Sequence, residues 1–125
     1  MRTPNRTLTG QELEIMKVVW ELRQATVRDV YEKLLEQRPI AYTTVMTMMN
    51  IMEQKGFLKK LPAEGRAYVY QSARPRKQVI RSMVREFVDR VFNGSAEPLV
   101  VHLVQDRQLS EKELKEIARI IEEGQ

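Results

Sequence analysis

Hydroxyl and amide side chains recur with helical spacing between residues 42 and 50. Residues at i, i+3, i+4 and i+7 share one face of a helix. One such face carries Thr43, Met46, Thr47 and Asn50. Hydroxyls can bond base edges, methyl groups can contact thymine, and an asparagine amide can pair with adenine. This face therefore suits the reading of a DNA major groove, although a polar helix face taken alone is more often simply solvated.

The start of the same predicted helix adds two residues to this candidate reading surface. Tyr42 and Thr44 flank Thr43 in the first turn, which in many DNA-binding helices is the part that contacts bases. No arginine or lysine occurs between residues 42 and 54, so the base contacts would be hydroxyl and methyl contacts. Phosphate contacts would then come from elsewhere in the chain. The candidates are Arg2 or Arg6, Arg28, the following hairpin and the segment from Arg74 to Lys77.

Basic residues occupy a short hairpin that follows this helix directly. Residues 57–72 predict two strands around a turn at residues 62–65, and they carry Lys59, Lys60 and Arg66. These cations could bond phosphates, or they could keep the hairpin edges from pairing with another sheet. A helix followed by strand, turn and strand is the order of elements in a winged helix, so we expect this hairpin to be the wing.

The rest of the chain offers little for catalysis or metal binding. The absence of cysteine excludes disulfides, thiolate metal sites and a cysteine nucleophile. His102 is the single histidine and lies in an apolar run, where a packed or interfacial side chain is commoner than a ligand or a general base. We find no Ser/His/Asp set around it and no glycine-rich phosphate loop. We therefore expect no enzyme activity, no metal site and no cofactor.

Capping residues and hydrophobic periodicity predict the elements that hold these side chains. Three pairs match capping boxes or their variants, namely Thr9 with Glu12, Thr26 with Asp29, and Ser110 with Glu113. The expected helices run from about residue 9 to 23, from 26 to 38, from 41 to 55, from 75 to 93, from 99 to 105 and from 110 onward. Gly56 can adopt the left-handed conformation that ends the third of them.

Composition is that of a basic globular chain. Its 125 residues carry a net charge of +4, and 42% are hydrophobic. Residues 1–73 hold 11 Lys/Arg against 8 Asp/Glu, residues 74–95 hold 6 against 2, and residues 96–125 hold 4 against 7. The basic part suits an acidic partner such as DNA, although a generic basic protein remains the alternative. No apolar run approaches 18 residues and the first residues lack the apolar core of a signal peptide, so we expect a cytoplasmic protein without membrane contact.

Apolar stripes in the last third of the chain predict a dimerisation module. Three helices there, tethered by an extended segment, have little of their own chain to pack on, and each apolar side chain buried gains about 1.5–3 kcal/mol. A second copy of the chain is the simplest partner, and folding back on the N-terminal part is the alternative. The expected dimer residues are Val84, Phe87, Val88, Val91, Leu99, Val100, Leu103, Val104, Ile117 and Ile121.

The predicted fold is mainly α with a small β-hairpin wing. It consists of a winged helix-turn-helix domain at residues 1–73 and a helical dimerisation domain at residues 74–125.

This pattern resembles the BlaI/MecI family of bacterial penicillinase repressors over nearly the whole chain. The segments that carry the resemblance are Leu8–Trp20, Ala41–Thr47, Lys55–Phe57, Gly65–Tyr70, Phe92–Gly94 and Leu99–Leu114. The resemblance implies a homodimeric repressor that binds a two-fold operator and controls β-lactamase or other stress-response genes. It also implies that bases are read mainly from the first turns of the recognition helix. Those positions are Thr43, Thr44, Met46 and Thr47.

The resemblance further bears on induction. Family members that respond to β-lactams are cleaved at an Asn-Phe bond after a membrane sensor signals, and the matching position here is His102-Leu103. A related branch releases DNA when copper binds a Cys-x-Cys tail, a route that this cysteine-free chain lacks. Two other functions remain alternatives, an effector-sensing winged-helix regulator without proteolytic induction and a protein-interaction adaptor that does not bind DNA.

Overall fold

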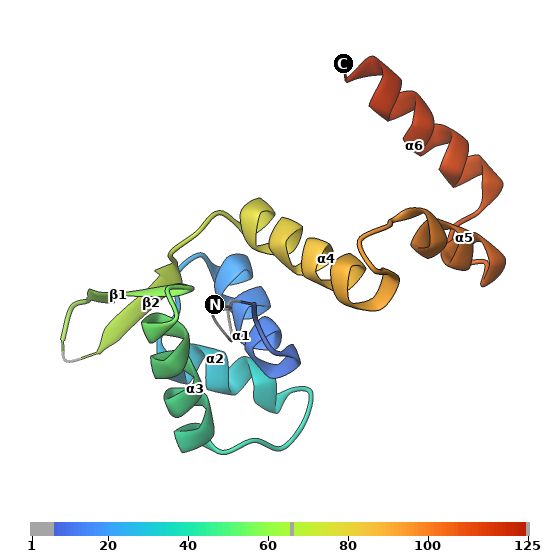
Figure 1. Cartoon of the computed structure of the whole chain (residues 1–125). Coiled ribbons are helices and arrows are strands. Elements are labelled where there is room, and N and C mark those ends of the chain that lie inside the picture. The colour runs from blue at the N-terminus through green and yellow to red at the C-terminus, as the bar shows by residue number, and fades with distance from the viewer. Residues whose placement is uncertain (1–6, 66, 125) are drawn as a thin grey trace. The chain divides into compact units, whose positions relative to one another are not determined.

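The computed structural model describes residues 7–65 and 67–124. Its elements, in chain order, are α1 (Gly10–Leu22), α2 (Val27–Leu35), α3 (Tyr42–Gln54), β1 (Leu58–Pro62), β2 (Tyr68–Ser72), α4 (Arg76–Phe92), α5 (Glu97–Gln105) and α6 (Glu111–Glu123) (Figure 1). The chain is thus mainly helical with one two-stranded antiparallel hairpin, as predicted. Within the described residues, no helix is both long and apolar enough to cross a membrane.

Local sequence starts three of the helices as expected. The side chains of Thr9, Thr26 and Ser110 each accept the backbone N–H three residues on, and the acidic side chain there accepts the cap's own N–H. These reciprocal bonds satisfy N–H groups that have no partner inside the helix. In α6 the N–H of Ser110, and then its hydroxyl, hold the pKa of Glu113 below its usual value because they stabilise the ionised carboxylate.

The chain divides into two compact units, with the boundary between Met83 and Val84. The sequence placed this boundary ten residues earlier, between 73 and 74. The first turns of α4 belong to the first unit because Val79 is 2% exposed and joins its core, with Met83 packed against that core.

The first unit is a three-helix bundle closed by the hairpin (Figure 1). Its core is built from side chains on every element and includes Ile15, Met16 and Val19 of α1, Val30 and Leu34 of α2, Val45, Met49 and Met52 of α3, and Leu58 and Tyr70 of the hairpin. The methionines of α3 pack in this core, which is their usual role.

The hairpin is held to the bundle by a third extended segment. Leu58 pairs with Ser72 and Pro62 with Tyr68, in an antiparallel register. Ala25, between α1 and α2, forms a bridge with Tyr70 through two backbone hydrogen bonds of 3.0 and 2.8 Å. These bonds fix the second strand against the helices.

The second unit leaves most of its apolar side chains uncovered. Neither α5 nor α6 contains a buried residue. Val88 of α4 is buried, at 9% exposed, and the rings of Phe87 and Phe92 meet edge to face at 5.9 Å. The helix α5 begins at Glu97, two residues earlier than expected, and Pro98 lies in its first turn, where its missing N–H is not needed.

Candidate nucleic-acid interface

The helix α3 presents one buried and one exposed face. Val45, Met49 and Met52 are fully buried in the core. The residues that the sequence proposed for base reading lie on the other side, and Thr43, Thr44, Met46 and Thr47 are all exposed. The side chains needed for groove reading are therefore accessible, while their contacts with bases remain a prediction.

An aromatic cluster fixes the first turn of α3. The rings of Tyr42 and Tyr31 meet edge to face at 5.4 Å, and the guanidinium of Arg28 lies 5.5 Å from the Tyr42 ring centre. Tyr42 is therefore partly committed to packing the start of α3 on α2. Arg28 also forms an ion pair with Glu32, with 3.8 Å between Nη1 and Oε2.

Asn50 has an internal partner that sequence reasoning missed. The Tyr70 hydroxyl donates to its Oδ1 at 3.2 Å, and Tyr70 is only 3% exposed. A buried phenol needs such an acceptor, so Asn50 joins the end of the reading face to the wing. Pairing of Asn50 with adenine would have to use the rest of its amide.

The basic residues of the wing have different surroundings. Lys59 is exposed, whereas the Nζ of half-buried Lys60 lies 4.8 Å from the ring centre of Tyr68 and 5.7 Å from that of Tyr70. Lys60 is thus partly engaged by cation–π contacts, and Lys59 is the freer candidate for phosphate. Arg66, the third predicted wing cation, lies outside the described residues.

Two other basic residues that the sequence suggested as phosphate contacts make internal contacts instead. The Nε and Nη2 of Arg74 donate to the carbonyls of Gly56 and Lys55, at 3.2 and 3.5 Å. The guanidinium of Arg76 lies 5.5 Å from the ring centre of Trp20. Lys77 is exposed. Of the segment from Arg74 to Lys77, only its last residue therefore has the surroundings expected of a free phosphate contact.

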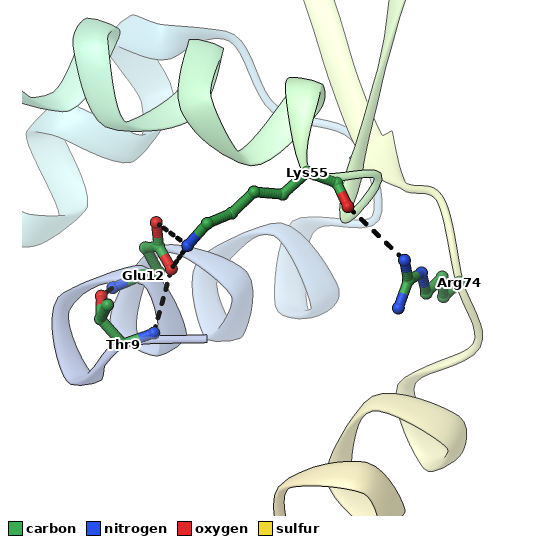
Figure 2. Close-up of polar contacts among 4 residues, drawn as sticks. All are labelled: Thr9, Glu12, Lys55 and Arg74. Carbon is green, nitrogen blue, oxygen red and sulfur yellow. Dashed lines mark hydrogen bonds and ion pairs between the residues drawn. The ribbon is translucent and has the colours of Figure 1, made fainter. Parts of the chain in front are cut away.

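A buried ion pair that the sequence did not indicate holds the far end of α3. The Nζ of Lys55 lies 2.9 and 3.0 Å from the two carboxylate oxygens of Glu12 (Figure 2). Glu12 is 5% exposed and also accepts the N–H of Thr9. The sequence showed only the capping role of Glu12, because 43 residues separate it from Lys55.

Most of the predicted dimer residues are exposed or half-buried, and Val88 alone among them is buried. Val84, Phe87, Val91, Val100, Ile117 and Ile121 are between 37% and 58% exposed, and Leu99, Leu103 and Val104 are half-buried. Val88 is buried in the chain itself, so it has little surface left for a partner. His102 and Leu103 lie inside α5, and the His102 Nε2 is 3.0 Å from Asp106 Oδ2 on the exposed helix surface.

A three-helix bundle whose third helix exposes a polar face beside a two-stranded wing defines a winged-helix protein of the DNA-binding class. A crystal structure of the ferric uptake regulator of Vibrio cholerae shares this fold, with a TM-score of 0.50 and 18% identity over 71% of this chain and 82% of that one.

Sequence comparison gives the family. Residues 8–123 match the family described as penicillinase repressor, and the chain belongs to that family, as its resemblance predicted. It is 29% identical over 116 residues to a penicillinase repressor of Bacillus licheniformis, covering 93% of this chain and 90% of that protein. It is 23% identical over 114 residues to the methicillin resistance regulatory protein MecI of Mammaliicoccus sciuri, covering 91% and 92%. The protein is a DNA-binding transcriptional repressor.

Proposed function

We propose that the protein represses transcription as a homodimer that binds a two-fold symmetric operator, with α3 of each subunit in the major groove. The exposed row of threonines on α3, opposite a buried methionine stripe and beside the wing, carries this proposal. A major groove admits an α-helix, and its base edges offer both donors and acceptors to hydroxyl groups.

The chemistry of α3 predicts how bases are read. The helix contains no arginine or lysine from Tyr42 to Gln54, so recognition would use threonine hydroxyls together with threonine and Met46 methyl groups against thymine. Lys59 and Lys77 supply exposed positive charge for the phosphate backbone. Contacts of that kind give affinity without sequence preference.

The uncovered apolar surface of the second unit supports the homodimer. Burying an apolar side chain gains about 1.5–3 kcal/mol, and a second copy of the chain presents the same surface for mutual burial. Such self-complementary contact is the rule in two-fold dimers. A dimer also matches an operator with two half-sites.

The relatives suggest what the protein controls. They are named as a repressor of penicillinase and as a regulator of methicillin resistance, so we place the regulated genes in the response to β-lactams or in a related stress response. An upstream sensor and cleavage at His102-Leu103 belong to this proposal. Because that bond lies within α5, a protease would have to open the helix to reach it.

Replacement of Thr44 or Thr47 by alanine is expected to weaken operator binding by about 1–3 kcal/mol for a lost base contact. Binding to non-specific DNA should not change, since phosphate contacts remain. Fluorescence anisotropy would measure both affinities on an operator found by footprinting upstream of the protein's own gene. Gln11→Ala, at an exposed position of α1, is the control. Wild-type operator affinity in both threonine variants would mean that another surface reads the bases.

Charge reversal at Lys59 should weaken binding to all DNA sequences alike. The loss of one phosphate contact is expected to reduce the slope of log affinity against log salt by about 1. Titrations at several salt concentrations give this slope, and Lys17→Glu, at an exposed position of α1, is the control. Equal salt slopes for Lys59→Glu and wild type would exclude a phosphate contact at Lys59. A wild-type protein whose affinity hardly depends on salt would point to the adaptor function.

A further inference from the structure

The carbonyl end of α3 is bonded by the segment that leads into α4. Arg74 donates from Nε to the carbonyl of Gly56 at 3.2 Å and from Nη2 to that of Lys55 at 3.5 Å, and its guanidinium lies 4.7 Å from the ring centre of buried Phe57. Gly56 has φ +86°, and a Cβ there would lie 3.2 Å from Arg74 Nη2. Glycine therefore serves both the left-handed turn and the close approach of Arg74.

The same end of α3 is held from a second direction. Lys55 caps α3 with its backbone, while its Nζ bonds both carboxylate oxygens of Glu12 at the start of α1 (Figure 2). Lys55 thus contacts two charged residues. Glu12 belongs to α1, and Arg74 lies two residues before the start of α4.

The chemistry of this contact suits arginine in particular. The last carbonyls of a helix lack partners and carry partial negative charge, so a cation is favourable there. A guanidinium can donate to two oxygens while its face stacks on a ring, which an ammonium cannot do. Arg74 donates from Nε and Nη2 to two backbone carbonyls, and its guanidinium lies close to the Phe57 ring.

We propose that Arg74 is a positioning residue for operator recognition, because it sets how α3 is presented to the major groove. Arg74 also ties the end of α3 to the start of α4, which anchors in the first unit through Val79 and continues into the second. This inference rests on the proposed function, since it takes α3 as the helix that reads DNA. The role differs from the phosphate contact that the sequence suggested for the same residue.

Arg74→Gln tests the inference, with operator affinity, non-specific affinity and salt slope measured together. We expect operator affinity to fall at least about fivefold, the lower range for one lost base contact, with non-specific affinity and salt slope unchanged. Arg74→Lys keeps the positive charge at the helix end but loses the forked guanidinium. Its operator affinity should therefore lie between those of Arg74→Gln and the wild type. Val18→Ala, on α1 in the core of the first unit, controls for lost stability, and melting temperatures are compared for all variants.

Three results would overturn this role. Equal loss on operator and non-specific DNA, with a salt slope lower by about 1, would make Arg74 a phosphate contact. Wild-type operator affinity in Arg74→Gln would leave it no part in recognition. An equal loss of operator affinity in Val18→Ala, at a similar melting temperature, would mean that the effect comes from lost stability alone.

If Thr44→Ala weakens operator binding while Arg74→Gln does not, only the positioning role fails. If the wild type shows no operator preference, the proposed function fails as well.

Discussion

The double variant Ile117→Asp, Ile121→Asp is expected to be monomeric and to bind a two-fold operator about 10²–10⁴-fold more weakly than wild type, because one subunit no longer raises the local concentration of the other. The two isoleucines are 41% and 58% exposed and lie one turn apart on α6. Aspartates at these positions would have to be desolvated in any apolar interface, at high cost. The affinity of the variant for a single half-site should equal that of one wild-type subunit, since α3 and the wing are unchanged.

Sedimentation equilibrium and operator titration measure these two effects on the same samples. Lys115→Asp, at an exposed position on the polar side of α6, is the matched control and should remain dimeric. Circular dichroism confirms that the helices persist in both variants. A double variant that stays dimeric would show that the exposed face of α6 is not the interface.

Replacement of Lys55 by methionine is expected to lower the free energy of unfolding of the first unit by about 3–5 kcal/mol, as for other buried pairs that lose one partner. Glu12 would keep its charge at a site only 5% exposed, with the Lys55 ammonium no longer beside it. The double variant Glu12→Gln, Lys55→Met should recover much of this loss. Glutamine can still accept the N–H of Thr9 in the capping box, and no unpaired charge remains.

Urea denaturation followed by the fluorescence of Trp20 reports on this unit, because the Trp20 indole N–H donates to Ser72 within it at 3.2 Å. Arg38→Met serves as the comparison. It removes an ion pair with Glu14 whose side chains are about one-third exposed, and the change in unfolding free energy should stay within about 1 kcal/mol. If Lys55→Met were as mild as Arg38→Met, the pair with Glu12 would not be what secures the end of α3.

Much of this protein follows from short-range sequence information. Capping boxes at Thr9, Thr26 and Ser110 mark helix starts because each one involves residues only three positions apart. The apolar periodicity of α3 separated the buried methionines from the exposed threonines, since helical geometry assigns each residue to a face. The order of helix, wing and helices, together with the family resemblance, therefore follows from the amino-acid sequence alone.

Only the tertiary structure showed which polar and charged groups have internal partners. Asn50 meets Tyr70 from 20 residues away, Arg74 meets Gly56 from 18, and Lys55 meets Glu12 from 43. In the sequence Asn50 and Arg74 have the same pattern as free groove and phosphate contacts, because residue type and spacing do not reveal what the folded chain brings alongside. Packing of α1, α3 and the hairpin around one core creates these neighbours, and so decides which polar side chains are left to meet DNA.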